Sequence, residues 1–135
     1  MKELSIDATI EKLDEVLAFL DGELEAAECP MKEQMQLDVA VEEIFVNIAS
    51  YAYEPGTGYA LIRIDILEDP KRARVTFVDE GIQYDPLKKE DPDITLSAEE
   101  RQIGGLGIYM VKKSMDSMSY EYKDNKNILI IEKNI

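Results

Sequence analysis

Residues 104–120 read GGLGIYMVKKSMDSMSY, a glycine-rich loop that runs directly into a helical pattern of apolar residues. Gly104, Gly105 and Gly107 leave the backbone free to direct several N–H groups at one anion, and the positive end of the helix adds to that attraction. Phosphate binding is therefore the natural use of this segment. A flexible hinge beside a tightly packed helix is the alternative, since the spacing matches neither a dinucleotide fingerprint nor a Walker A loop.

The segment before this loop, residues 82–103, has no sustained hydrophobic period and contains Pro86, Pro92 and a charge cluster at residues 88–91. A stretch of more than twenty residues without a clear element is uncommon inside a small domain and is usually functional. We therefore expect a lid over about residues 82–103.

A β-hairpin precedes the predicted lid. Two runs have a period of two, with turn residues at 69–72 between them: Ile62, Ile64 and Ile66 alternate with Leu61, Arg63, Asp65 and Leu67, and Ala73, Val75 and Phe77 alternate with Arg74, Thr76 and Val78. The second strand leads directly into Asp79-Glu80-Gly81. A carboxylate fixed at a strand end can accept a hydrogen bond from an exocyclic amine, and a neighbouring glycine lets a flat ring approach the backbone. An ordinary turn is the alternative for the same three residues.

Two amphipathic helices are predicted before the hairpin, one from Ile10 to about Glu28 and one from about Pro30 to Ala52. Glu43 and Asn47 lie four residues apart on the second helix, so their side chains are neighbours at the margin of its apolar arc. A carboxamide oxygen can coordinate magnesium, and a carboxylate can accept a proton or orient a water molecule. An ordinary polar surface is the alternative interpretation of this pair.

Two closing strands are predicted after the helix that follows the glycine-rich loop. They cover residues 118–122 and 128–132, and residues 123–127 form the loop between them.

The composition restricts the possible chemistry. The chain of 135 residues carries 29 acidic and 15 basic residues, so its formal net charge is −14. Such a charge opposes binding to nucleic acid or to an anionic membrane surface. The sequence has no histidine, which excludes Ser-His-Asp catalysis, Cys-His catalysis and histidine autophosphorylation. The length predicts one domain over residues 1–135, and the single Cys29 without a spanning apolar run predicts a cytoplasmic protein.

The order of these features resembles the GHKL nucleotide-binding superfamily, also called the Bergerat ATP-binding fold. Residues 43–47 resemble its N box, residues 79–81 its first glycine box and residues 104–108 its second. The resemblance covers nearly the whole chain and implies an α+β two-layer sandwich, in which helices cover one face of a mixed, mostly antiparallel sheet. Within this superfamily, the short chain and the absence of histidine favour a resemblance to the anti-sigma-factor serine/threonine kinases of bacterial partner switching. Residues 104–120 also resemble the corresponding segment of these kinases.

This resemblance implies a role for each matching residue. Glu43 is expected to be the general base that accepts the proton of a substrate serine, and Asn47 to coordinate Mg²⁺ on the phosphates of ATP. Asp79 is expected to bind the adenine amine. The remaining expected contacts with the nucleotide come from Gly81 beside the base and from Gly104, Gly105, Leu106 and Gly107 around the phosphates.

The implied function is an ATP-dependent serine/threonine protein kinase that phosphorylates a small antagonist protein and sequesters a sigma factor or a similar regulator, as a homodimer. Two departures from the family pattern stand beside it: Gln83 occupies the place of a second glycine, and Tyr51-Ala52-Tyr53 follows the N box where histidine is common. A non-catalytic nucleotide-binding regulatory module and a slow ATPase switch are the alternatives.

Overall fold

The computed structural model describes residues 1–88 and 105–135 of the chain. These residues form five strands, three α-helices and three short helical turns. In chain order the elements are β1 (Lys2–Asp7), η1 (Ile10–Lys12), α1 (Leu13–Ala26), α2 (Met31–Asn47), η2 (Ile48–Ala52), β2 (Tyr59–Leu67), β3 (Arg72–Asp79), η3 (Pro86–Lys88), α3 (Gly105–Ser114), β4 (Ser117–Lys123) and β5 (Lys126–Asn134).

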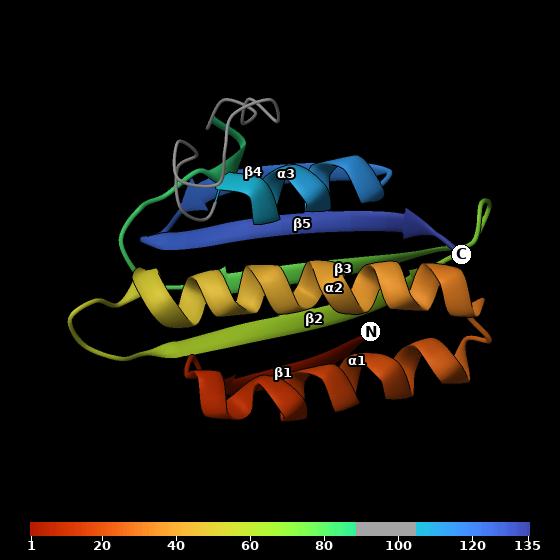
Figure 1. Cartoon of the computed structure of the whole chain (residues 1–135), viewed down its shortest axis with the longest axis horizontal. Coiled ribbons are helices and arrows are strands. Elements are labelled where there is room, and N and C mark those ends of the chain that lie inside the picture. Colours follow the sequence, from red (N-terminus) through yellow and green to blue (C-terminus); the bar gives the residue numbers. More distant parts are fainter. Residues whose placement is uncertain (89–104) are drawn as a thin grey trace.

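The strands form one sheet in the order β1-β2-β3-β5-β4, and every pairing among the described strands is antiparallel. The three α-helices lie together over one face of this sheet, with α2 between α1 and α3 (Figure 1). The architecture is the predicted α+β two-layer sandwich.

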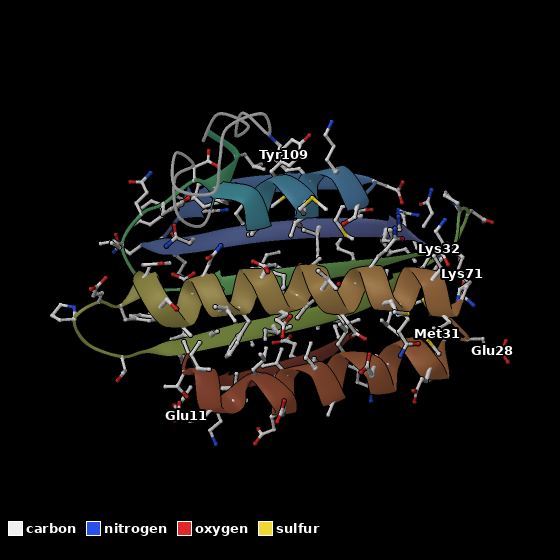
Figure 2. The ribbon with its side chains drawn as sticks, in the orientation of Figure 1. Glu11, Glu28, Met31, Lys32, Lys71 and Tyr109 are labelled. Atoms are coloured by element: carbon white, nitrogen blue, oxygen red, sulfur yellow. The ribbon has the colours of Figure 1, made fainter. Side chains whose placement is uncertain are left out.

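The core lies between the two layers. Along β2, Ile62 and Ile64 are buried while their neighbours Leu61 and Arg63 are only half-buried, because successive side chains of a strand point to opposite faces. Side chains from both layers fill the space between helices and sheet (Figure 2). The members with almost no exposed surface are Val16, Leu20, Leu24, Leu37, Val41, Ile44, Phe45, Ile62, Val75, Phe77, Val111 and Ile131.

The structure differs from the sequence-based expectations at three places. Residues 2–7, for which no element was predicted, form β1 and pair with β2. The second predicted helix is α-helical only as far as Asn47 and then widens into the π-helical turn η2. The predicted loop at residues 123–127 is wrong, because β4 and β5 are joined by Asp124 and Asn125 alone, both with positive φ as a tight hairpin turn requires.

None of the described helices is both long enough and apolar enough to cross a lipid bilayer.

Candidate functional site

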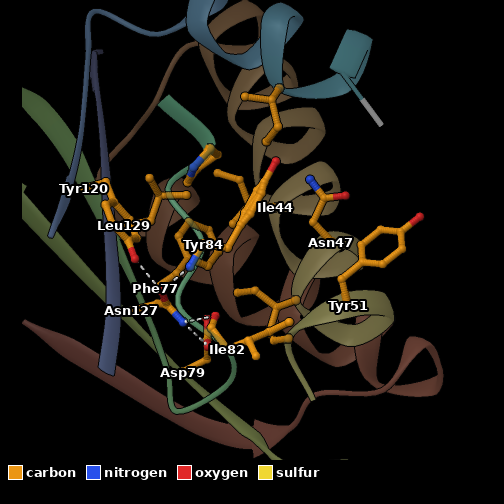
Figure 3. A pocket seen from close by; sticks show the side chains of 14 residues that line it. Ile44, Asn47, Tyr51, Phe77, Asp79, Ile82, Tyr84, Tyr120, Asn127 and Leu129 are labelled. Carbon is orange, nitrogen blue, oxygen red and sulfur yellow. Dashed lines mark hydrogen bonds between the residues drawn. The ribbon is translucent and has the colours of Figure 1, made fainter. Parts of the chain in front are cut away.

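A cavity of about 470 Å³ opens between the C-terminal part of the second helix and the central strands. Its walls come from α2, η2, β3, β5, β4, α3 and the segment after β3, so residues distant in sequence meet there (Figure 3). The lining is mostly apolar, with a few polar groups, as in most small-molecule sites. The lining residues are Ile44, Asn47, Ile48, Tyr51, Ala52, Phe77, Asp79, Ile82, Tyr84, Pro86, Ile108, Tyr120, Asn127 and Leu129.

Asp79 supplies the only carboxylate among the described residues that line this cavity. It is the last residue of β3 and is 6% exposed. Its Oδ1 accepts hydrogen bonds from the backbone N–H of Gly81 and from Nδ2 of Asn127, each at 2.9 Å. Burial raises the pKa of Asp79, and these two hydrogen bonds oppose that rise. A carboxylate held in this way keeps Oδ2 available to accept a hydrogen bond from a ligand.

Asn127 organises the polar end of the cavity, and the sequence analysis did not identify it. Its Nδ2 donates to Oδ1 of Asp79 and to the carbonyl of Ile82, both at 2.9 Å. Its Oδ1 accepts from the backbone N–H of Tyr84 and from the hydroxyl of Tyr120. The side chain is 6% exposed, so a fully hydrogen-bonded amide ties β5 to the end of β3.

Gly81 is required by the close approach of η2. A Cβ atom at Gly81 would lie 2.2 Å from the carbonyl oxygen of Ala52, a backbone atom that cannot move aside easily. Next to it, the N–H of Ile82 donates to the same carbonyl at 2.9 Å. The end of β3 is therefore docked on the π-helical turn, an irregularity frequent at functional sites.

Tyr53 fixes the same region from the other side. Its hydroxyl donates to the carbonyl of Tyr59 at 2.6 Å and accepts from the backbone N–H of Glu80 at 2.7 Å. Burial raises the pKa of this phenol, so it stays protonated and can donate. The ring passes so close to Gly58 that a Cβ atom there would lie 2.3 Å from it. Tyr53 thereby links the start of β2 to the residue after Asp79.

Glu43 and Asn47 lie at the end of α2 that is close to α3, the helix that begins at Gly105. Asn47 lines the cavity from the last residue of α2. Glu43, one turn earlier, is half-buried and does not line the cavity. Its carboxylate lies against α3, because a Cβ atom at Gly107 would be only 2.2 Å from Oε2 of Glu43. The fold thus brings Asn47 and Asp79 into one cavity, with Glu43 and Gly107 in contact one turn away.

The remaining predicted residues are placed as follows. Gly105 and Leu106 begin α3, whereas Gly104 and residues 89–103 of the predicted lid lie outside the described residues. Within the described part of that lid, Ile82, Tyr84 and Pro86 line the cavity. Gln83 is exposed and does not line it.

The described residues of the cavity could bind magnesium together with a nucleotide, but not by themselves. No group of three or more Cys, Asp or Glu side chains among residues 1–88 and 105–135 could hold a metal ion by itself. Asn47 offers one neutral carboxamide oxygen at the cavity wall. Magnesium commonly binds through one or two protein oxygens together with substrate phosphates and water. The donor set therefore suits a magnesium ion that arrives with a nucleotide.

The sequence is similar to one protein family and to a named kinase. Residues 6–133 match the family described as Histidine kinase-like ATPase domain. The chain is 28% identical over 95 residues to the serine/threonine-protein kinase BtrW of Bordetella bronchiseptica, a match that covers 70% of this chain and 66% of that protein. The chain thus spans just under two thirds of the length of this curated relative.

Two solved structures have the same fold. The structure of the RsbU and RsbW domains of a Mycobacterium tuberculosis protein aligns over 99% of this chain and 32% of its own, with a TM-score of 0.68 and 15% identity. The SiaB-SiaC complex from Pseudomonas aeruginosa aligns over 100% of this chain and 90% of its own, with a TM-score of 0.62 and 18% identity.

Proposed function

Because the chain belongs to the histidine kinase-like ATPase domain family, we propose that it is an ATP-dependent serine/threonine protein kinase of a bacterial partner-switching system. The observation that carries this proposal is the contact of Glu43 with Gly107 of α3, one turn from a cavity that is lined by Asn47 and Asp79. The relationship to a serine/threonine-protein kinase supports the same activity. A module that only bound nucleotide would not need a carboxylate at this position.

Nucleotide recognition begins at the polar end of the cavity. The 6-amino group of adenine donates to the free oxygen of Asp79, while the apolar walls, among them Ile44 and Leu129, bury the faces of the base. Guanine, which has a carbonyl at the corresponding position, would oppose its oxygen to the carboxylate. The preference for adenine follows from this difference.

Phosphoryl transfer takes place near the start of α3. The N-terminal end of this helix, where Gly105 and Gly107 lie, directs backbone N–H groups toward the phosphates of ATP. The hydroxyl oxygen of the substrate serine forms a bond to the γ-phosphorus, the bond from that phosphorus to the β–γ bridging oxygen breaks, and ADP leaves. Glu43 accepts the serine proton as the new bond forms. Mg²⁺, held on Asn47, supplies positive charge against the phosphates when it is bound.

The substrate we propose is a serine of a small antagonist protein, and the second partner is a sigma factor or a similar regulator. Two structures with the same fold support a protein partner, since one contains the RsbU and RsbW domains of a single protein and the other is the complex of SiaB with SiaC. We propose that the kinase acts in the cytoplasm, where ATP is supplied.

The test is a transfer assay with γ-labelled ATP, magnesium and the candidate antagonist. We expect labelling to fall by about 10²–10⁴-fold in Glu43→Gln, because the general base is removed without a change of shape. Glu42→Gln, which alters the exposed neighbouring carboxylate, is the matched control and should label like the wild type. Unchanged labelling in Glu43→Gln would refute the assigned base.

Nucleotide binding is tested separately by calorimetry. Asp79→Asn replaces the acceptor with an amide that can also direct a donor at the adenine amine, so we expect ATP binding to be lost. The same assays separate the alternatives. Phosphate release without any labelled acceptor would indicate an ATPase switch, and binding without turnover would indicate a regulatory nucleotide-binding module.

We also propose that the chain forms a homodimer through the face of the sheet that none of the described helices covers. Leu61, Val78 and Ile128 lie side by side across β2, β3 and β5 on this face. Charges of both signs accompany this apolar row, as in the pair Arg74 and Glu132 at 3.3 Å. A second copy can therefore cover the row without bringing together charges of one sign. Light scattering should show a dimer that Leu61→Lys dissociates.

A further inference from the structure

The outward face of α2 carries an apolar row that nothing in the described chain covers. Met31, Met35 and Val39 are 69%, 60% and 55% exposed. Their spacing of four residues places them along one ridge of the helix, which we call the α2 stripe. Figure 2 shows Met31 at the beginning of this ridge. Single exposed apolar residues are ordinary, but three in a row along one ridge indicate a contact surface.

Carboxylates lie along the side of the α2 stripe that faces α1. Asp38 and Glu42 come from α2 itself, and Asp21 and Glu25 come from the adjacent α1. Burial, a hydrogen bond with Asp21, and repulsion from Asp21, Glu25 and Glu42 together raise the pKa of Asp38 to about 7, so these carboxyl groups lie close together. None of these four side chains takes part in an ion pair with another described residue. We call these four residues the carboxylate border.

We propose that the α2 stripe and the carboxylate border together dock an amphipathic helix of a partner protein, with an apolar row flanked by Lys and Arg. The apolar row of that helix covers the α2 stripe, and its cations relieve the repulsion within the carboxylate border. A second copy of this chain is the wrong occupant, because it would bring a second set of carboxylates to the same surface. That the partner is the regulator held by the kinase rests on the function proposed above.

The docking surface is separate from the nucleotide cavity. The cavity uses the C-terminal part of α2 through Ile44 and Asn47, which face the sheet. The α2 stripe lies on the N-terminal part of the same helix and faces away from the sheet, opposite the buried Leu37 and Val41. Substitutions in the α2 stripe therefore leave the predicted catalytic residues in place, and acceptor labelling measures those residues independently of docking.

The probe is a synthetic helical peptide of about 18 residues, with leucines along one face and lysines on both sides of it. Its control is a peptide of the same composition in scrambled order, which has the same charge and no apolar face. Binding is followed through the methionine methyl signals of the full chain in NMR. Met31 and Met35 report on the α2 stripe, Met110 is an exposed methionine on another helix, and Met115 is buried.

We expect the amphipathic peptide to shift the Met31 and Met35 signals selectively and saturably. The scrambled peptide should bind about tenfold more weakly or not at all, and Met35→Lys should weaken binding of the amphipathic peptide by about tenfold. Met35→Leu keeps an apolar side chain and should bind like the wild type, so it controls for any loss of folding.

Equal binding of the two peptides would show that net charge alone attracts them and would overturn the proposal. So would equal shifts at Met110, or unchanged binding by Met35→Lys. Failure of the kinase function has a different result: acceptor labelling would be absent in the wild type while the amphipathic peptide still docks. If the proposed kinase function is correct, the Met35→Lys variant should label the antagonist like the wild type.

Discussion

The contact between Gly107 and Glu43 leads to a substitution that should separate activity from stability. In Gly107→Ala the new Cβ would lie 2.2 Å from Oε2 of Glu43, whereas ordinary contacts begin at 3.4 Å, so the carboxylate must retreat by about 1.2 Å. A displacement of about 1 Å at a reacting group can cost about 10²-fold in rate. We therefore expect kcat for acceptor phosphorylation to fall by about 10²-fold.

The stability of this variant should change little. The obstructing atom is the end of a flexible side chain, so the helices do not have to separate. Alanine also favours a helix over glycine by up to about 1 kcal/mol. The free energy of unfolding, measured by denaturant titration, should stay within about 1 kcal/mol of the wild type. The matched control is Gly22→Ala in α1, where an added Cβ meets nothing within 4 Å and activity should be unchanged.

A double substitution decides whether the loss acts through Glu43. Because Glu43→Gln already removes the base, adding Gly107→Ala should lower kcat little further. Two results would refute this reasoning. One is a folded Gly107→Ala variant with wild-type kcat, and the other is a double variant in which the two losses multiply. A change confined to KM for ATP would instead assign Gly107 to phosphate binding alone.

Three further predictions concern Asn127 and Tyr53 beside the cavity and Asp38 in the carboxylate border. Asn127→Leu removes one of the two hydrogen-bond donors to Oδ1 of Asp79 and leaves only the backbone N–H of Gly81, so denaturant titration should show a loss of about 3 kcal/mol and calorimetry weaker ATP binding; intact binding would contradict the role of Asn127. Tyr53→Phe removes the hydroxyl that joins the carbonyl of Tyr59 to the N–H of Glu80, so KM for ATP should rise several-fold while a loss of only about 1 kcal/mol leaves the chain folded. The pKa of Asp38 is about 7 against an ordinary 3.8, so the folded state favours the protonated carboxyl group. The stability that this group contributes is present below about pH 4 and is lost as the pH rises through about 7. Because the side chain is partly exposed, the loss is about 1 kcal/mol, and Asp38→Asn should remove this part of the pH dependence.

Much of the fold could be predicted because its signals are local. The alternation of Ile62 and Ile64 with Arg63 and Asp65 defines a strand with one buried face, whatever it pairs with. The spacing of four between Glu43 and Asn47 puts them on one side of any helix that forms there. Asp79 follows its strand directly in the chain, so its place at a strand end needed no tertiary information.

Other features could not be predicted because their causes are distant in the chain. Residues 2–7 have only a weak strand pattern, and pairing with β2 makes them a strand. Asn127 reads as part of a polar loop, yet β5 lies beside β3 and brings its amide to Asp79, 48 residues earlier. A polar residue in a polar segment carries no sign that it will be buried and fully hydrogen-bonded.

The sequence by itself determined the chemistry that this protein can use. Without histidine, and with a net charge of −14, we expect the proton acceptor to be a carboxylate, and we expect backbone N–H groups and a cation to balance the charge of a polyanionic ligand. The tertiary structure alone decided which groups act together. In the folded chain Glu43 contacts Gly107, Asp79 accepts hydrogen bonds from Asn127 and Gly81, and the α2 stripe is exposed to solvent. Residue types and short spacings are written along the chain, whereas these contacts exist only once antiparallel strands and packed helices bring distant segments within van der Waals reach.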